Sequence, residues 1–442
     1  MTAGQATAQT TDPIAGSPVY PRGSRVNDAG HLEIGGCDVV ELAREFGTPA
    51  YIYAPDDIRS RARRFTAALA DRDADGEVLF ASKSAPVTAI YSIAREEGLS
   101  VDVASGGELH TALRAGFDPA RIYMHGNNKS EAELSFAFET GVGCIVVDSL
   151  DEIARADSLL SDRAAGSQDV LIRLTPGIKP STHSYVQTGQ VDSKFGFGLA
   201  DGQASEAVAA VESARNLELA GFHAHIGSQI FELEPYVRAI EALAEFAASM
   251  RPRLLNVGGG LGIAYEADDA PPSIDEYVGV KVEGVRRLFG DVPRILIEPG
   301  RSLVGNAGVT MYTVGTVKEI PGVRSYVAVD GGMSDNLRPM LYGSRYEALI
   351  ADRAAAPAES LVTIAGKHCE SGDVLVTDTK LADPRPGDVL VTPATGAYGY
   401  AMANNYNGIP RPPVIFCSGG DARVVVRRET YEDLTARDVS DD

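Results

Sequence analysis

The sequence predicts an α/β protein built from a (β/α)₈ barrel and a second, all-β domain. Eight short runs of β-branched and apolar residues alternate with longer helical patterns from residue 78 to 300, which is typical of βα units and a parallel sheet. Polar residues stand at the carboxyl end of nearly every run, and a closed barrel gathers such ends at one mouth. After residue 308 the helical patterns stop, and short strands separated by Gly, Pro and Asp follow.

The eight runs supply the strands of the predicted barrel. They are VLFAS (78–82), VDVAS (101–105), IYMHG (122–126), CIVVDS (144–149), VLIRLTP (170–176), AGFHAHIG (220–227), LLNVGGG (254–260) and ILIEPG (295–300). Helical patterns rich in Ala, Glu and Arg fill the intervals, at 86–98, 106–115, 130–140, 149–160, 203–215, 234–249 and 275–289. Ser105, Ser130 and Asp148 stand where helices begin and are expected to be their N-caps.

An open, doubly wound sheet is the alternative, because YIYA (51–54) reads as a further strand. The polar residues at the ends of the runs favour closure, since an open sheet would spread them along an edge. These residues are Lys83, Asp102, His125, Asp148, Arg173, His225, Gly258 to Gly260 and Glu298.

Residues 309–442 predict the all-β domain. SGGD (418–421) indicates a hairpin, and TYEDL (430–434) indicates a short final helix. A strand at HLEIGG (31–36) is expected to join this domain. We therefore divide the chain into a flexible tail (1–25), an N-terminal segment of the β domain (26–48), the barrel (49–308) and the C-terminal β domain (309–442). The connection at 176–198 is long enough to cover the barrel mouth as a lid.

Composition narrows the class of protein. The 442 residues carry 40 Lys and Arg against 61 Asp and Glu, a net charge of −21, which argues against nucleic-acid and anionic-membrane partners. The four cysteines form no CxxC pair or Cys/His cluster, so neither a metal centre nor a disulfide framework is indicated. The sequence has no run of 18 apolar residues, and its first 22 residues do not resemble a secretory signal. We expect a cytoplasmic protein.

Lys83 directly follows the first predicted barrel strand. If it is buried there, desolvation lowers its pKa and frees an amine that can form a Schiff base. The ordinary alternative is a lysine that extends its ammonium from the rim into water, and taken alone the position favours that alternative.

Three glycines follow the seventh strand, in NVGGGLG (256–262). Glycines at a strand end allow backbone N–H groups to approach an anion, and barrels commonly bind phosphate at this place. A tight turn is the alternative, but a turn rarely needs three glycines.

Glu298 ends the eighth strand in ILIEPGRS and is expected to point into the mouth, where a buried carboxylate needs a partner. Arg301 is one candidate for that partner, and a cationic ring nitrogen of a bound ligand is another. His225 and Ser228, in HAHIGSQ, end the sixth strand, although a lone histidine is more often a hydrogen-bonded core residue.

The β domain adds weaker candidates. Cys369 and Glu370 lie in a predicted turn, GKHCESGD (366–373), while Arg338 and Tyr342 lie in NLRPMLYG and Tyr398 in ATGAYGY. Taken singly, such residues are most often inert thiols, packing residues or surface residues.

Together, however, these motifs resemble one family. ASK, VDVASGGEL, HGNNKS, SKFGFG, HIGSQ, NVGGGLGIAY, EPGRS, NLRP with LYG, GKHCESGD and TGAYGY occur in this order between residues 81 and 400. They resemble the diaminopimelate decarboxylases, which belong to the alanine-racemase-like, fold type III pyridoxal-phosphate enzymes. The resemblance implies decarboxylation of meso-2,6-diaminopimelate to L-lysine and CO₂, the last step of lysine biosynthesis.

The resemblance also implies roles for individual residues. Lys83 would hold pyridoxal 5′-phosphate covalently, His225 would stack on its ring, and Glu298 would pair with the ring nitrogen. The phosphate would be held by Gly258, Gly259, Gly260, Ser228 and Tyr398, and Pro299, Gly300 and Arg301 of the EPGR motif would also line the cofactor site. A carboxylate beside the ring nitrogen favours its protonated form, which suits decarboxylation better than racemisation.

The substrate's far end would be recognised by the remaining motifs. The resemblance assigns its carboxylate to Arg301, Arg338 and Tyr342, beside Tyr398, and its ammonium to Glu370. Cys369 would protonate the reacting carbon after CO₂ leaves. In this family Cys369 and Glu370 come from the neighbouring subunit, so a homodimer with active sites at the subunit interface is implied.

Alternatives remain at this stage. ASKSAP lacks the asparagine that many members carry shortly after the lysine, which admits a relative acting on ornithine, lysine or carboxynorspermidine, or a racemase. A sugar-phosphate aldolase with Lys83 as its Schiff-base lysine would leave the β domain without a role. A protein that only binds pyridoxal phosphate would have no use for Cys369, Glu370 and Arg301.

Overall fold

The computed structural model describes residues 12–161, 166–178, 193–290 and 293–439. Eight parallel strands pair in one continuous ring: β5 (Gly76–Ala81), β6 (Ser100–Val103), β7 (Ile122–Met124), β8 (Cys144–Val147), β9 (Gln168–Thr175), β11 (Leu217–His223), β12 (Leu254–Asn256) and β13 (Arg294–Ile297). Pairing of Ile295 with Gly76 joins the last strand to the first, and the short β10 (Phe197–Gly198) pairs with β9. The predicted closed barrel is confirmed.

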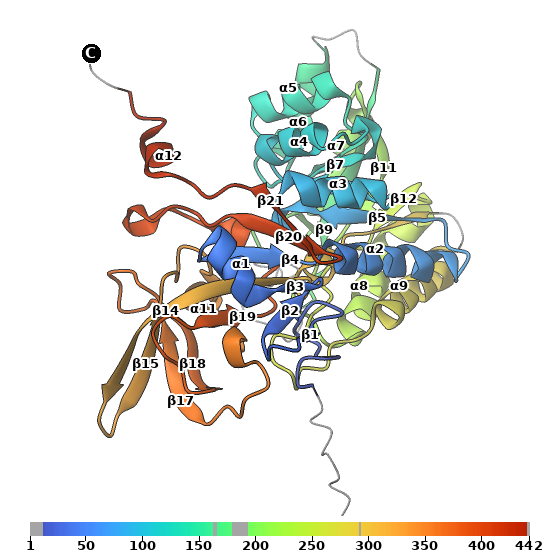
Figure 1. Ribbon diagram of the computed structural model, residues 1–442. Coiled ribbons are helices and arrows are strands. Elements are labelled where there is room, and N and C mark those ends of the chain that lie inside the picture. The colour runs from blue at the N-terminus through green and yellow to red at the C-terminus, as the bar shows by residue number, and fades with distance from the viewer. Residues whose placement is uncertain (1–11, 162–165, 179–192, 291–292, 440–442) are drawn as a thin grey trace, which may run out of the picture.

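Helices cover the outside of the barrel (Figure 1): α2 (Pro55–Ala70), α3 (Thr88–Glu96), α4 (Gly106–Arg114), α5 (Glu131–Thr140), α6 (Leu150–Ser161), α7 (Gln203–Ser213), α8 (Glu234–Ala247) and α9 (Ile274–Phe289). Ser105 and Ser130 accept hydrogen bonds from the N–H groups of Glu108 and Glu133, as N-caps do. The predicted cap Asp148 is wrong by one residue, because Ser149 accepts the Glu152 N–H.

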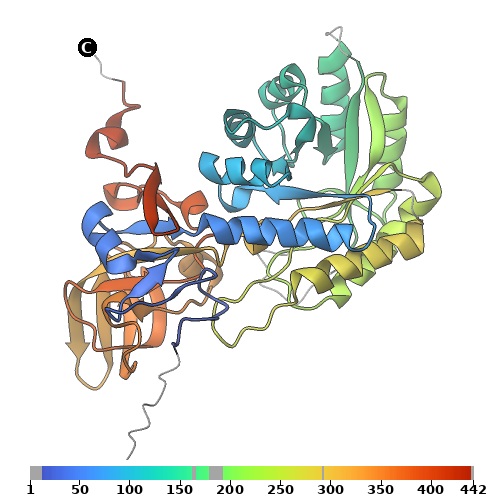
Figure 2. The ribbon, with the colours of Figure 1, turned by 45° about the vertical axis from the view of Figure 1, so that its right-hand side comes forward.

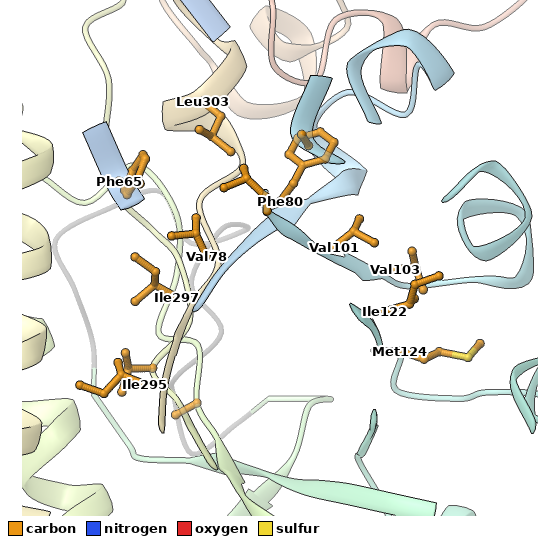
Figure 3. Packing of buried hydrophobic residues seen from close by; sticks show 14 of the residues in the cluster. Phe65, Val78, Phe80, Val101, Val103, Ile122, Met124, Ile295, Ile297 and Leu303 are labelled. Carbon is orange, nitrogen blue, oxygen red and sulfur yellow. The ribbon is translucent and has the colours of Figure 1, made fainter. Parts of the chain in front are cut away.

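The period of two residues along each strand creates two apolar layers. Residues such as Val78, Val101 and Ile297 point outward to the helices, and Figure 3 shows Val78 and Ile297 near Phe65 of α2. The residues between them fill the barrel interior: Leu79, Tyr123, Cys144, Val146, Leu171, Ala220 and Leu296. The same alternation brings the polar residues at the strand ends into the mouth. On this inward face lie Asp102, His125, Arg173, His223, Asn256 and Glu298.

The second domain is a mixed sheet that lies beside the barrel (Figures 1 and 2). Its strands are β14 (Gly308–Ile320), β15 (Arg324–Val329), β16 (Leu349–Ile350), β17 (Ser360–Ala365), β18 (Val374–Leu381), β19 (Val389–Thr392), β20 (Val414–Ser418) and β21 (Asp421–Val426). The short helices α10 (Arg301–Val304) and α11 (Arg338–Tyr342) follow β13 and β15. The SGGD hairpin joins β20 to β21 as predicted, and a Thr430 capping box begins α12 (Tyr431–Thr435), which stands apart from the rest of the domain in both views.

Two N-terminal segments differ from the expectation. The strand β4 (Ala50–Tyr53) falls within the range expected for the barrel, yet it pairs with β14 and β20 of the second sheet. Its four residues are all buried, because Tyr51 and Tyr53 face the barrel core while Ala50 and Ile52 face the core of the β domain. Because β4 is buried on both faces, its sequence is a continuous apolar run like that of a barrel strand.

The segment around HLEIGG packs against the β domain without pairing with its main sheet. The strands β1 (Arg25–Val26), β2 (Leu32–Ile34) and β3 (Cys37–Asp38) form a small sheet of their own before α1 (Val39–Phe46). Leu32 and Ile34 are buried in the same core as Val309 and Ile415.

Residues 1–11 of the predicted tail lie outside the described residues. Within its remainder, Ile14, Val19 and Tyr20 are buried against the β domain, because apolar side chains of this size gain by leaving water. Most of the predicted lid, 179–192, is likewise outside the described residues. Among the helices that are described, none combines the length and apolarity needed to span a bilayer.

Candidate active site

A cavity of about 340 Å³ lies at the carboxyl ends of the barrel strands and extends to the second domain. It brings together most of the residues that the sequence predicted: Lys83, His225, Ser228, Gly260, Glu298, Gly300, Arg301, Arg338, Tyr342 and Tyr398. Asp102, His125, Arg173 and His223 line it as well. Gly258, Gly259, Pro299, Cys369 and Glu370 are predicted residues that do not line it in this chain.

Lys83 enters the cavity from a single 3₁₀ turn, Ser82–Ser84, that follows β5. The turn is anchored on both sides: the Ala81 N–H donates to Pro299 O at 3.1 Å, and the Tyr398 N–H donates to Ser84 O at 2.8 Å. These bonds give Pro299 a backbone role in holding the lysine. The side chain is enclosed by the cavity walls but remains accessible to the water inside them.

The expectation of a lowered pKa for Lys83 is wrong for the protein alone. Burial acts to lower the pKa of Lys83, but the charges of Tyr398, Asp102 and Glu298 outweigh it, and the net shift is upward. Lys83 is therefore an ammonium in this environment. It must give up a proton before its nitrogen can act as a nucleophile.

Glu298 is held at the bottom of the cavity by three polar side chains, not by Arg301. Asn256 Nδ2 donates to its Oε1 at 2.7 Å, His125 Nε2 lies 2.9 Å from the same oxygen, and His223 Nε2 lies 3.3 Å from Oε2. Burial acts to raise the pKa of Glu298, but His125 and His223 hold it well below its usual range. The carboxylate is therefore an anion that faces the cavity.

These side chains could also hold a metal ion. Among the described residues, Glu298, His125 and His223 are the one group of three or more His, Cys, Asp or Glu side chains whose possible ligand atoms all lie within 4.8 Å of one another. Burial lowers the pKa of His223 to about 4, so that imidazole is neutral at pH 7. A single anion bordered by a neutral imidazole and an amide suits a protonated ring nitrogen. The donor set thus fits the pyridine end of pyridoxal phosphate.

The segment Val257–Gly260, which we call the glycine loop, turns sharply after β12. The Gly258 N–H donates to Asn256 Oδ1 at 3.0 Å and the Gly259 N–H donates to His225 Nδ1 at 3.2 Å. A Cβ atom at Gly259 would lie 2.1 Å from Glu298 O, so a side chain there would collide with the backbone. Gly258 and Gly259 thus serve packing and internal hydrogen bonds, and Gly260 is the member of the three that faces the cavity.

His225 receives its hydrogen bond on Nδ1, so a neutral ring carries its proton on Nε2. Burial and the nearby Lys83 hold the pKa of His225 well below its usual range. A neutral, edge-anchored imidazole at the cavity wall can stack on a flat aromatic ring, as the family resemblance implies.

Two buried guanidinium groups lie on the side of the cavity nearest the second domain. Arg301 donates to Ser228 Oγ at 3.1 Å and to the Tyr265 hydroxyl, and Arg338 donates to the Tyr346 hydroxyl at 2.6 Å. Arg301 and Arg338 are 5% and 4% exposed, and neither forms an ion pair with a carboxylate in the part of the chain that the structure describes. Since buried cations need anionic partners, this pair fits a ligand carboxylate.

Cys369 and Glu370 lie in the turn between β17 and β18, as predicted, but their side chains are exposed. The turn is held by buried neighbours: His368 Nδ1 lies 2.7 Å from Asp373 Oδ2, and Asp373 also accepts the Met333 N–H. The structure therefore orders these two residues without bringing them to the cavity of their own chain.

His223 and Asn256 are site residues that the sequence analysis did not single out. Asp102, His125 and Arg173 were noted as strand-end polar residues but received no role. Counting alternate residues back from each strand end would have placed all five on the inward face beside Glu298.

Comparison with known proteins identifies the family of this chain. The pyridoxal-dependent decarboxylase family, through its pyridoxal binding domain, matches residues 55–305. The diaminopimelate decarboxylase of Bacillus subtilis is 50% identical over 94% of this chain and 97% of its own length, and that of Mycobacterium tuberculosis is 41% identical over 95% and 98%. The crystal structure of diaminopimelate decarboxylase from M. jannaschii in complex with L-lysine has a TM-score of 0.88 at 31% identity, covering 94% of this chain and 98% of that one. With this identity over nearly its full length, the chain belongs to the diaminopimelate decarboxylase family of pyridoxal-dependent decarboxylases.

Proposed function

We propose that this chain decarboxylates meso-2,6-diaminopimelate to L-lysine and CO₂ with pyridoxal 5′-phosphate held at Lys83. The observation that carries the proposal is that an anionic Glu298 and Lys83 face the same cavity, whose far side presents two buried guanidinium groups without a carboxylate partner among the described residues. When bound, pyridoxal phosphate supplies an electron-accepting ring that can take up the electron pair left by the departing carboxyl group.

Each residue of the cavity that we name here either positions the cofactor or holds a proton on it. Glu298 holds a proton at the ring nitrogen, because an adjacent anion favours the cationic form. Lys83 supplies the amine to which the cofactor is attached. The Gly260 N–H has no acceptor among the described residues and would bind the phosphate, together with the Ser228 hydroxyl, which also accepts from Arg301.

Arg301 and Arg338 are proposed to bind the carboxylate at the far end of the substrate. Tyr265 contacts both: Arg301 donates to its hydroxyl, and Arg338 lies 4.7 Å from its ring centroid. L-Lysine lacks the carboxylate that reacts but retains this far end, so it can occupy the site without reacting further. Ornithine offers no second carboxylate and would leave this pair of cations uncompensated, which favours diaminopimelate over the related decarboxylases.

We also propose that the working enzyme is a homodimer in which Cys369 and Glu370 of one subunit complete the cavity of the other. Both side chains are exposed and neither reaches the cavity of its own chain, although a buried contact between His368 and Asp373 holds the turn that bears them. In the complete site, Glu370 would bind the far ammonium and Cys369 would return a proton to the reacting carbon. The cytoplasmic location stays a prediction.

The test is incubation of the purified protein with pyridoxal phosphate and meso-diaminopimelate while CO₂ and lysine are measured. We expect release of both in equal amounts, and no release from Lys83→Ala. Arg338→Ala should lose activity on diaminopimelate, while Arg345→Ala, an exposed arginine beside the same helix, should retain it. Undiminished turnover by Lys83→Ala would contradict the proposal, and undiminished diaminopimelate turnover by Arg338→Ala would contradict the binding of the far carboxylate by Arg338.

A further inference from the structure

A buried lysine without a place in the proposed reaction lies directly behind the glycine loop. Lys281 stands on α9 and is 1% exposed, and its Nζ donates to Val257 O at 2.6 Å and to Gly258 O at 2.8 Å. Its third contact is the hydroxyl of Tyr277 at 2.7 Å, which itself donates to Gly258 O at 3.2 Å. Every hydrogen bond of this side chain therefore serves the loop, directly or through one hydroxyl.

Burying a lysine at this position costs free energy of desolvation. Burial lowers the pKa of Lys281 well below its usual range, and no carboxylate among the described residues forms an ion pair with it. The rings of Tyr236 and Tyr277 lie 4.9 and 4.3 Å from its nitrogen and offset only part of the desolvation cost. A methionine would fill the same space without that cost. What the lysine adds is hydrogen bonding to two peptide carbonyls.

The first of these peptide groups leads to Glu298. In a trans peptide the N–H points away from the C=O, so a bond to Val257 O on the side of α9 directs the Gly258 N–H toward the barrel. There it donates to Asn256 Oδ1 at 3.0 Å, and Asn256 Nδ2 donates to Glu298 Oε1 at 2.7 Å. Lys281 is thus linked to the carboxylate at the bottom of the cavity through one peptide and one amide.

The second peptide group leads to His225. Its carbonyl, Gly258 O, accepts from Lys281, from Tyr277 and from the Glu298 N–H at 3.1 Å, and its N–H, on Gly259, donates to His225 Nδ1 at 3.2 Å. That bond sets which ring nitrogen carries the proton and how the imidazole is turned. Polarisation of the carbonyl by the lysine strengthens the donor on the other side of the same peptide.

We propose that Lys281 is a positioning residue of the cofactor site: by fixing the carbonyls of the glycine loop, it orients the two peptide groups that hold His225 and, through Asn256, Glu298. The proposal rests on the proposed function, because its effect is read at pyridoxal phosphate. It assigns a role to a residue that touches neither cofactor nor substrate.

The deciding variant is Lys281→Met, which keeps the length of the side chain and removes its donors. The chain loses all three hydrogen bonds that Lys281 donates, two of them to the carbonyls of the glycine loop, so we expect the dissociation constant for pyridoxal phosphate to rise at least about tenfold. The absorbance spectrum of the bound cofactor should also change, because His225 and Glu298 both face its ring. Both measurements are made on the full-length protein by titration with pyridoxal phosphate alone.

Val282→Ala is the matched control, since Val282 is the next residue of α9 and is also 1% exposed. It should lower the melting temperature and leave the cofactor's affinity and spectrum unchanged. Tyr277→Phe removes one hydroxyl from the same network and should shift the affinity in the direction of Lys281→Met by a smaller factor. Folded Lys281→Met with wild-type affinity and spectrum would overturn the proposal. If that variant does not fold, wild-type affinity in Tyr277→Phe would overturn it.

The two proposals fail in different ways. Titration with pyridoxal phosphate needs no diaminopimelate, so a wild-type protein that binds the cofactor but forms no lysine would contradict the proposed function alone. A wild-type protein that forms lysine, paired with an unaltered Lys281→Met, would contradict the positioning role alone.

Discussion

The charge of one side chain, Glu298, decides which chemistry the cavity favours. Its carboxylate is buried, and in an apolar setting burial would have kept it neutral. Asn256, His125 and His223 instead stabilise the anion, and burial keeps His223 neutral. The protein thus keeps a negative charge at the bottom of the cavity, where the proposed function places the protonated ring nitrogen of the cofactor.

Replacing Glu298 by Gln tests this charge with little change of shape. We expect Glu298→Gln to retain bound pyridoxal phosphate through Lys83 and to lose at least about a hundredfold in kcat, the size of loss caused by removing one preorganised electrostatic contact. CO₂ release and cofactor absorbance measure the two quantities separately. Glu77→Gln is the control, because Glu77 is buried at the other end of the same barrel, where it accepts from the Tyr123 hydroxyl. Glu298→Gln with wild-type turnover would show that this charge is not needed.

His223 predicts how stability depends on pH. Burial lowers its pKa from 6.5 to about 4, while Glu298 acts against that shift and His125 and Arg173 act with it. Between these values the unfolded chain binds a proton that the folded chain does not, so stability falls as pH drops from 6.5 to 4. Melting temperatures of the wild type and His223→Gln across this window should differ in slope, with the variant flatter. His110→Gln, at an exposed position, should follow the wild type; parallel curves for His223→Gln would contradict the assignment.

For individual residues, the sequence predicted those that belong to recognisable motifs. It missed those that contribute only through a hydrogen bond to another residue. Lys83, Glu298 and Arg301 stand out because each follows a strand or a glycine in a recognisable run. Lys281 has the sequence context of an ordinary helix residue. Its hydrogen bonds to the glycine loop depend on how α9 lies against β12, which no local pattern specifies.

Among the structural elements, the glycine loop shows most clearly why its positions need glycine. Gly258 has φ +66° and Gly260 φ +106°, so both need the freedom of glycine, whereas Gly259 is required because of the Glu298 carbonyl beside it. The loop therefore ties the end of β12 to the end of β13. A change at one glycine is transmitted to Glu298 through the backbone.

Gly259→Ala tests this contact between the glycine loop and the end of β13. The added Cβ would lie 2.1 Å from Glu298 O, so the end of β13 must move, and we expect about 1–3 kcal/mol lower stability and at least about tenfold weaker binding of pyridoxal phosphate. Urea unfolding and cofactor titration provide the two measurements. Gly290→Ala is the control: Gly290 has φ +70°, and no atom of the described residues, its chain neighbours aside, lies within 4 Å of an added Cβ. The substitution should therefore cost about 1 kcal/mol of backbone strain and leave binding unchanged. Equal affinities in both variants would refute the tie.

The strand β4 shows where element-level prediction from sequence stops. The run YIYA indicates a strand correctly, and as a strand beyond the eight it was the reason for considering an open, doubly wound sheet. Burial on both faces comes here from packing between two domains, while a strand of a parallel sheet would be buried between helices. The two environments select the same residues, so the assignment of β4 to the second sheet required the structure.

At the level of the whole molecule, both domains line the cavity, and the chain passes between the domains twice. Lys83 and Glu298 follow the barrel strands β5 and β13, while the segments around Arg338 and Tyr398 come from the β domain. The fold class could be predicted because each domain has its own repeating pattern in the sequence. The proposed sharing of sites between subunits rests on the family resemblance instead, because no local pattern indicates what the turn of Cys369 and Glu370 contacts.

Shared active sites make a quantitative prediction for mixed dimers. We expect Lys83→Ala and Glu370→Ala each to be nearly inactive, and their co-expression to restore about a quarter of wild-type activity. Random pairing makes half of the dimers mixed, and each mixed dimer would contain one intact site of two, because both defects fall in the other site. Co-expression of Lys83→Ala with Glu298→Gln is the control: both residues line the cavity from the same chain, so every site in a mixed dimer carries a defect and no activity should return. Recovery in neither pair, with mixed dimers isolated by two affinity tags, would mean that Glu370 does not act across the interface.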